Sequence, residues 1–323
     1  MKAYRPHPAW VPWLFLAPFG VLFSTFIGWP LLRSLILAFE QTYGPRTRVF
    51  VGFLNFQGVW HDPWFWTAVG NTLLVAGGIL VVQMPVALGL ALLLNRPGLR
   101  GRALFRLVFF SPYVVGAVFV STLFALLLEK RIGLVNHGLH ALFLRWDPNF
   151  PWLDQYVKTS LVAASVWLST GFNLAYLLAA LQNVSRELLD AAAIDGAGPW
   201  QRFWHVTLPE IRPVLNILVL LTITGGLQLF DLPFILYNDT AGNGPNSQAL
   251  TVVTYLYQTG FISGNLGYAS AIGWILTLAL VGFTVLTLLP FAWMLGAAFK
   301  LPADIAGSQF LPSGDGFLGV AWD

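Results

Sequence analysis

The sequence predicts an all-α, polytopic membrane protein with six transmembrane helices. Of its 323 residues, 57% are hydrophobic and only 10% are charged, whereas roughly a quarter of the residues in soluble domains are charged. Six apolar runs reach the length of about 20 residues that a helix needs to cross a hydrocarbon core. The 14 tryptophans agree with this class, because tryptophan concentrates at membrane–water interfaces.

The first apolar run, Trp13–Ile36, follows Lys2 and Arg5, as the core of a secretory signal would. It is longer than a signal core and lacks a clear small-residue cleavage site, so we expect a spanning helix. Every run is expected to be helical, because an isolated strand cannot satisfy its backbone hydrogen bonds in lipid. The other five predicted helices are Ala68–Leu94, Leu107–Leu128, Leu161–Leu181, Pro213–Leu236 and Tyr268–Leu289.

The distribution of Lys and Arg orients these helices. Six crossings place both termini on one side of the membrane. With a cytoplasmic N-terminus, the inner segments hold ten Lys and Arg residues and the outer segments hold six, with Arg33 inside the first helix, which fits the positive-inside rule. The predicted organisation is a cytoplasmic N-terminus at residues 1–12, a transmembrane domain at residues 13–289 with a cytoplasmic loop at residues 185–214, and a C-terminal tail at residues 290–323.

Composition and motifs disfavour several function classes. The formal net charge of +3 forms no dense basic face, so we expect no nucleic-acid partner. The absence of cysteine excludes disulfides, thiolate metal sites and cysteine nucleophiles. His137 and His140 lie in an outer loop without a carboxylate at ligand spacing, so a solvated loop is the simpler interpretation and no metal site is predicted. The sequence contains no P-loop motif, so we expect no cofactor on this chain and ATP with Mg on a partner subunit.

The segment between the fourth and fifth predicted helices is amphipathic and interrupted by Gly and Pro. Ser185 can cap a short helix with Glu187 in its first turn, and Gly196 or Gly198 can end that helix in a left-handed turn. Pro199 suits the first position of a second helix, "PWQRFWHVT", which we expect to stop before the following Leu-Pro pair. The carboxylates of the segment lie on a solvated helix with no implied pocket, so no catalytic residue is predicted.

Physical reasoning leaves two interpretations of this segment open. The two short helices can lie on the membrane surface with Trp and Arg at headgroup level. Alternatively they can form a docking surface, since Ala191–Ala193 allow a close approach to the backbone and Trp200, Phe203 and Trp204 offer apolar anchors.

The stretch "ELLDAAAIDGAGPWQRFWHVTLPEIRP" resembles the cytoplasmic EAA loop of the membrane permease subunits of bacterial ABC importers. In that family Glu-Ala-Ala is followed after three residues by Gly, and then by an apolar stretch to Leu-Pro. This chain has Asp190-Ala191-Ala192, Gly196 and Leu208-Pro209 at that spacing, with Asp in place of the usual Glu. The stretches "LFRLVFFSPYVVGAVFVSTLF", "GLVNHGL" and "LFDLPFILYNDTAGNGPNSQALTVVTYLYQTGF" extend the similarity to maltose- and glycerol-3-phosphate-type permeases of the carbohydrate branch, over about residues 13–289.

This resemblance implies the type I ABC importer permease fold in a bacterial inner membrane. It implies a second homologous permease subunit, two cytoplasmic ATPase subunits and an extracytoplasmic solute-binding protein as partners, with a carbohydrate as cargo. The loop would be the coupling helix that inserts into a cleft of an ATPase subunit, whose closure on ATP would move the spanning helices. The predicted coupling residues are Glu187, Asp190, Ala191, Ala192, Asp195, Gly196, Trp200, Phe203, Leu208 and Pro209.

Polar residues inside the fourth and fifth predicted helices indicate a path for the cargo, because such residues are costly in a membrane and often line a pathway. Sugar hydroxyls need donors and acceptors, whereas the C–H faces of a sugar pack on aromatic rings. Similarity to the maltose-type permeases places lining positions on the same two helices. The predicted substrate path comprises Ser165, Leu168, Ser169, Phe172, Asn173, Thr222, Gly225, Gly226, Gln228 and Leu229. The alternative is that the small residues among them only pack helices together.

The charged residues of the predicted spans bear on the class of transporter and on its cargo. A phosphate cargo would favour an inward-facing Arg, and no Arg lies mid-span, which favours a neutral mono- or oligosaccharide over glycerol phosphate. A polyol is a further alternative. An ion-coupled secondary transporter should carry buried carboxylates, and the predicted spans contain only Asp231, which can also lie solvated near the outer interface. An intramembrane enzyme would need a His/Asp/Glu cluster at matched depth, and a non-transporting scaffold would not need inward-facing hydroxyls.

The tail stretch "LLPFAWMLGAAFKLPADIAGSQFLP" resembles the first helix end and first outer loop of the partner permease. A fused fragment and chance similarity both remain open as explanations.

Overall fold

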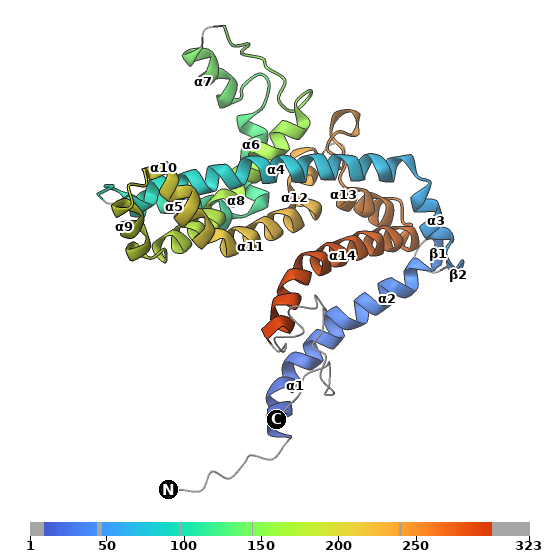
Figure 1. Cartoon of the computed structure of the whole chain (residues 1–323). Helices are drawn as coiled ribbons and strands as arrows, with labels where there is room; N and C mark the ends of the chain where they lie inside the picture. Colours follow the sequence, from blue (N-terminus) through green and yellow to red (C-terminus); the bar gives the residue numbers. More distant parts are fainter. Residues whose placement is uncertain (1–9, 44–46, 97, 144, 239–240, 299–323) are drawn as a thin grey trace. The chain divides into compact units, whose positions relative to one another are not determined.

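The computed structural model of the chain describes residues 10–43, 47–96, 98–143, 145–238 and 241–298, and Figure 1 shows the course of its helices. The predicted all-α class is confirmed, with one two-stranded hairpin in the described part of the chain. Contacts divide the chain into two compact units, residues 1–271 and 272–323, so that the boundary falls within the last helix. The part of the tail stretch beyond residue 298 lies outside the described residues.

One hairpin lies between the first two helices and the remaining helices of the described chain. The hairpin pairs β1 (Glu40–Tyr43) with β2 (Thr47–Phe50) in antiparallel register. The helices are α1 (Val11–Phe23), α2 (Trp29–Ala38), α3 (Leu54–Trp60), α4 (Pro63–Asn95), α5 (Arg102–Val115), α6 (Ala117–Leu127), α7 (Leu134–Leu142), α8 (Val157–Gln182), α9 (Arg186–Ile194), α10 (Pro199–Arg202), α11 (Leu208–Leu227), α12 (Asp231–Leu236), α13 (Val252–Tyr257) and α14 (Leu266–Ala298).

Five helical segments of the described chain are long and apolar enough to cross a membrane. They contain the first, second, fourth and sixth predicted spans in full, and α14 continues beyond the predicted end at Leu289. The five segments are Trp13–Ala38, Pro63–Asn95, Val157–Gln182, Pro199–Leu227 and Leu266–Leu289.

The third predicted span, Leu107–Leu128, is wrong as a single helix. It consists of α5 and α6, which meet at an angle of 105° (Figure 1). The bend lies at Gly116, whose φ of 94° and ψ of 167° suit a residue without a Cβ. Pro112, inside the last turn of α5, removes one helical hydrogen bond and weakens the same region.

The bent pair nevertheless returns the chain across the bundle, because α4 and α8 run in the same direction. A Cβ at Gly78 of α4 would lie 2.9 Å from Val162 Cγ2 of α8, and Ser169 of α8 lies 3.1 Å from Gln83 further along α4. The residue numbers at these contacts therefore rise in the same direction along both helices. The connection between two parallel neighbours must recross the layer, so counting α5–α6 as one span gives the six predicted crossings.

Two prolines lie inside long helices that contain π-helical turns. The turn Phe203–Thr207 joins α10 to α11, and the Leu208 N–H donates to the Phe203 carbonyl five residues back. Such a turn widens the helix next to Pro209, whose ring would otherwise crowd a carbonyl and which has no N–H to donate. The turn Ser24–Gly28 stands in the same relation to Pro30. The expectation that the helix stops before Leu208-Pro209 is wrong for this reason.

The predicted fifth span, Pro213–Leu236, is therefore wrong at both ends. One continuous helical segment runs from Pro199 to Leu227, and residues 231–236 form the separate helix α12. The chain between them leaves helical geometry at Phe230, with φ of −129°. The Thr251 hydroxyl donates to the Leu229 carbonyl at 2.8 Å, so a backbone acceptor freed by the break is satisfied.

Two apolar clusters lie at different heights in the first unit. Both contain side chains of α4 and α8, while α6 and α12 contribute to the first cluster and α11 to the second. Gly226 of α11 lies against Ala76 of α4, where a Cβ would come within 2.8 Å, while Leu218 of α11 packs in one cluster with Ala87 of α4. The helix α11 thus runs antiparallel to α4. The first cluster is Val75, Ile79, Val120, Val157, Leu161, Ala164, Leu232, Leu236, Tyr237 and Ala249. The second is Ala87, Ala91, Leu94, Leu174, Leu177, Leu178, Leu181, Val184, Ile211 and Leu218.

One carboxylate ties the start of α4 to two later helices. Asp62 caps α4 by accepting from the Trp64 N–H at 2.9 Å. Its other oxygen accepts from the hydroxyls of Tyr255 in α13 and Tyr268 in α14. Burial and the bond to Asp62 raise the pKa of Tyr255 above its ordinary value, so this hydroxyl remains a donor at physiological pH.

Candidate functional site

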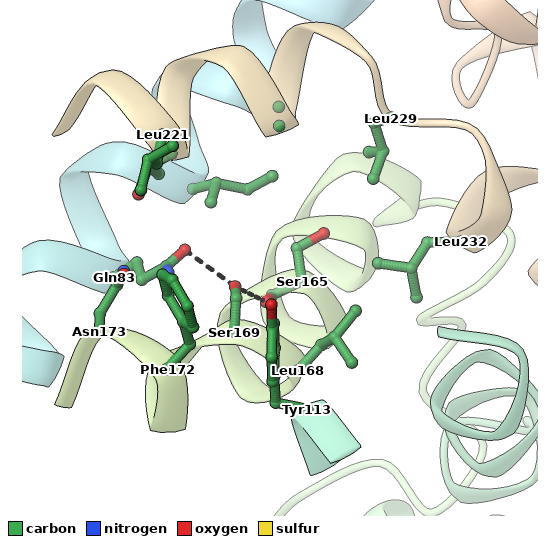
Figure 2. A pocket seen from close by; sticks show the side chains of 14 residues that line it. Gln83, Tyr113, Ser165, Leu168, Ser169, Phe172, Asn173, Leu221, Leu229 and Leu232 are labelled. Carbon is green, nitrogen blue, oxygen red and sulfur yellow. Dashed lines mark hydrogen bonds between the residues drawn. The ribbon is translucent and has the colours of Figure 1, made fainter. Parts of the chain in front are cut away.

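A cavity of about 360 Å³ lies between the two apolar clusters, and Figure 2 shows the side chains that line it. On α4 its lining falls between Ile79 of the first cluster and Ala87 of the second, and on α8 it falls between Ala164 and Leu174. Its volume is in the range of small-molecule sites. At this height, between the two clusters, α4 and α8 present polar side chains to the cavity.

Two buried polar atoms of the cavity wall have no hydrogen-bond partner among the described residues, Ser165 Oγ and Asn173 Nδ2. Ser165 is 5% exposed and Asn173 is 1% exposed. Buried polar groups are nearly always paired, and an unpaired one costs about 1–3 kcal/mol. Both residues line the cavity, so water or a ligand there can supply the missing partners.

An aromatic surface completes the wall. The Phe172 ring lies 5.0 Å from the Tyr113 ring and 4.8 Å from the Tyr176 ring, measured between centroids. Phe172 and Tyr113 both line the cavity, and none of the described lining residues is charged. Neutral hydrogen-bonding groups beside aromatic faces suit a ligand that has hydroxyls and C–H surfaces and no charge.

The structure brings together nine of the ten residues predicted for the substrate path. The exception is Gln228, which follows α11 as its C-cap and is exposed. Whether the nine contact a cargo stays a prediction. They are Ser165, Leu168, Ser169, Phe172, Asn173, Thr222, Gly225, Gly226 and Leu229.

Five further lining residues were missed by sequence reasoning: Ile79, Gln83, Tyr113, Leu221 and Leu232. Gln83 had a usable signal, because an amide in the middle of an apolar span is costly in lipid. The aliphatic residues had none, since only the fold distinguishes a cavity wall from a packed core.

The segment proposed for coupling folds into the expected bend. Helix α9 begins after Ser185 and has Glu187 in its first turn, but the Ser185 side chain makes no capping bond, which corrects that prediction. Gly196 ends the helix with φ of 81°. The N–H groups of Gly196 and Ala197 donate to the carbonyls of Ala193 and Ala192 at 3.1 and 2.9 Å, which is the Schellman motif that a left-handed glycine permits.

The second half of the segment presents an apolar, exposed surface. Pro199 is the first residue of α10, as predicted, and the Gly198 N–H donates to Gln201 Oε1 at 2.8 Å. Trp200 is 71% exposed and its ring packs 5.8 Å from those of Phe203 and Trp204. Exposed aromatic residues in a cluster mark a surface that another molecule or the membrane interface covers.

The other residues predicted for coupling surround the bend. A groove of about 330 Å³ is lined by Ala192, Asp195 and Gly196 together with Arg202 and His205. Asp190, Ala191 and Pro209 are exposed, and Leu208 is half-buried. The structure therefore gathers these side chains on one accessible segment, and their coupling role stays a prediction.

Comparison with known proteins decides the family. The family model described as "Binding-protein-dependent transport system inner membrane component" matches residues 83–295. The chain belongs to this family.

Individual relatives of this permease family agree. The chain is 37% identical to the lactose transport system permease protein LacF of Rhizobium radiobacter, over 82% of this chain and 89% of that protein. It is 34% identical to the arabinooligosaccharides transport system permease protein AraP of Bacillus subtilis, over 86% of this chain and 87% of that one. The sn-glycerol-3-phosphate transport system permease protein UgpA of Yersinia enterocolitica is 30% identical, over 88% of this chain and 96% of that one.

A solved structure shows the same permease fold. In the crystal structure of a bacterial ABC transporter that imports the acidic polysaccharide alginate, one chain superposes with a TM-score of 0.74 and 25% identity, covering 86% of this chain and 93% of that one. The predicted importer permease fold is thereby confirmed. The chain is a multi-pass permease of the inner membrane, and the region matched by the family model contains the bend at Gly196 and all the lining residues except Ile79.

Proposed function

We propose that this permease forms half of the translocation pathway of an ATP-driven, binding-protein-dependent importer of a neutral sugar. The carrying observation is the cavity between the two apolar clusters, whose described lining is uncharged and includes two unpaired polar atoms, Ser165 Oγ and Asn173 Nδ2. A sugar supplies hydroxyls for those atoms and C–H faces for Phe172 and Tyr113. Two of the relatives carry lactose or arabino-oligosaccharides in their names.

Glycerol phosphate is the second candidate, because a relative named for that cargo is 30% identical over most of the chain. A phosphate in a low-dielectric cavity requires a cation or several N–H donors. The described lining offers no Lys or Arg. A polyol would fit the lining as a sugar does, with fewer hydroxyls to bind.

The proposed partners are a second homologous permease, two cytoplasmic ATPase subunits and an extracytoplasmic solute-binding protein. A complex with an alginate pentasaccharide-bound periplasmic protein is known for the structurally similar alginate transporter. In this proposal the ATPase binds the coupling segment, residues 185–214, and performs all ATP hydrolysis with Mg, while this chain performs no catalysis. The exposed Trp200, the accessible Ala191 and the small residues at the bend support docking there. The Lys and Arg distribution supports a cytoplasmic N-terminus.

The test is ATP-driven uptake. The transporter is purified with its partners in mild detergent and placed in proteoliposomes with ATP inside. The uptake of lactose, arabinotriose and sn-glycerol 3-phosphate is then measured with the co-purified binding protein outside. We expect uptake of a neutral sugar that stops when ATP is omitted.

Three results would count against this proposal. Uptake driven by an ion gradient without ATP would indicate a secondary transporter. Uptake of glycerol phosphate alone would show that the uncharged lining was misinterpreted. Recovery of the chain without an ATPase, from conditions that keep other transporters assembled, would remove the proposed role of the coupling segment.

A further inference from the structure

Gln83 is a buried amide in an apolar stretch of α4. Its sequence neighbours are Val81, Val82 and Met84, and its side chain is 2% exposed. Removing an amide from water costs free energy unless its hydrogen bonds are replaced, and the cost is high inside a membrane-spanning helix. An aliphatic residue would pack at this position at lower cost, so the amide points to a polar partner.

Within the protein, Gln83 has one partner among the described residues, the hydroxyl of Ser169. Ser169 Oγ lies 3.1 Å from Gln83 Oε1 and 2.6 Å from the carbonyl oxygen of Ser165 (Figure 2). A hydroxyl has one proton and can serve only one acceptor at a time. The shorter distance favours the bond to the carbonyl four residues back, which Ser commonly makes in helices.

This competition leaves the Gln83 amide free to change its role. When the Ser169 hydroxyl donates its hydrogen bond to the Ser165 carbonyl, the Ser169 oxygen keeps lone pairs that can accept a hydrogen bond from the Gln83 NH₂ group. Turning the amide over then frees Gln83 Oε1 as an acceptor, whereas the opposite orientation frees its NH₂ group as a donor. Either orientation leaves hydrogen-bonding capacity at the cavity wall.

The neighbouring polar groups of the cavity wall indicate which ligand group can hydrogen-bond to Gln83. Asn173 Nδ2 and Ser165 Oγ are unpaired, and both residues line the same cavity as Gln83. A ligand hydroxyl donates and accepts, so it can pair with either orientation of the Gln83 amide. A phosphate or carboxylate only accepts, and the described lining carries no cation to offset its charge.

We propose that Gln83 is a specificity-determining residue whose amide hydrogen-bonds one hydroxyl of the neutral sugar in the cavity. This inference rests on the proposed function. It makes α4 a third polar wall beside α8 and α11. Sugars that lack that hydroxyl should be transported with a lower kcat/KM, because their binding leaves the buried amide unpaired.

The experiment pairs a protein change with a ligand change. Gln83→Met keeps an unbranched side chain of similar length and removes the amide. In proteoliposomes containing the complete transporter, uptake is measured for the sugar of the lactose and arabinotriose panel that is carried, and for each of its monodeoxy analogues. In the unmodified transporter one analogue should show kcat/KM about tenfold below that of the parent sugar. In Gln83→Met the parent sugar should lose about the same factor, and that analogue should lose nothing further.

Gln182→Met is the matched control, since it makes the same change at an exposed position outside this cavity. It should transport both sugars as the unmodified protein does. If Gln83→Met discriminates among the analogues as the unmodified protein does, Gln83 does not contact the sugar, although import itself is intact. If neither sugar of the panel is carried with ATP, the proposed function fails and this inference fails with it. Equal melting temperatures of the two variants show that any difference does not come from misfolding.

Discussion

Replacing Gly171 by Ala should loosen the crossing of α5 over α8 and thereby disturb the cavity. A Cβ at Gly171 would lie 2.1 Å from the Phe109 carbonyl oxygen and 2.6 Å from the Phe110 Cα. Both atoms belong to the α5 backbone and cannot rotate away, so α5 would have to move by roughly 1 Å, and overpacking of this kind costs about 1–3 kcal/mol. Ala gains only about 0.5–1 kcal/mol over Gly in a helix, so the net effect is destabilising.

The assay is thermal unfolding of the purified protein in detergent, followed by tryptophan fluorescence. Gly89→Ala in α4 is the control, because a Cβ there meets nothing within 4 Å, and this variant should melt at or slightly above the unmodified protein. Gly171→Ala should melt lower. It should also reduce sugar uptake, since Tyr113 reaches Phe172 at the cavity wall from the displaced helix. Equal melting of the two variants would refute the close crossing.

Three further outcomes follow from other parts of the molecule. Gly196→Ala should lower ATP-driven uptake more than Gly196→Asn, because a left-handed conformation costs an L-residue about 1 kcal/mol and Asn tolerates it better; equal uptake would contradict the strain argument. The chain has no cysteine, so single introduced cysteines can report the topology. A cysteine at Ile132 should react with an impermeant maleimide on intact cells, whereas one at Ile194 should react only after permeabilisation. The reverse pattern would show that the predicted orientation is inverted. Asp62→Leu leaves the hydroxyls of Tyr255 and Tyr268 without their shared acceptor. It should lower the free energy of unfolding by about 2 kcal/mol, and its melting temperature should fall below that of Asp62→Asn.

Much of the cavity lining could be predicted from sequence, because polar residues stand out in apolar helices. Ser165, Ser169 and Asn173 recur at helical spacing, and the structure places them on one cavity wall. Gln83 was missed because no other polar residue lies one or two helical turns away from it on α4. Its amide in an apolar span was a signal, but its pairing with Ser169 of another helix is visible only in three dimensions.

The errors in helix boundaries have specific physical causes. The Leu208-Pro209 pair predicts the end of a helix, but a π-helical turn accommodates Pro209 and the helix continues to Leu227. Gly116 lies in an apolar run long enough for one straight helix, and hydrophobicity alone carries no sign of a 105° bend. In both places the backbone conformation, rather than the apolar pattern, determined where the helix ended.

The most direct test of the coupling role of residues 185–214 is a cross-link from this segment to the ATPase. Ile194 is 86% exposed at the bend of this segment, and a single cysteine there can carry a maleimide–benzophenone cross-linker, which on irradiation forms a bond to C–H groups of whatever lies beside it in the complete transporter. A conjugate with the ATPase subunit should form from Ile194→Cys and not from Ile132→Cys, which lies in the predicted outer loop. A segment that yields no ATPase conjugate, while cross-linking to lipid, would contradict the coupling role and would identify the two short helices as a membrane-surface pair.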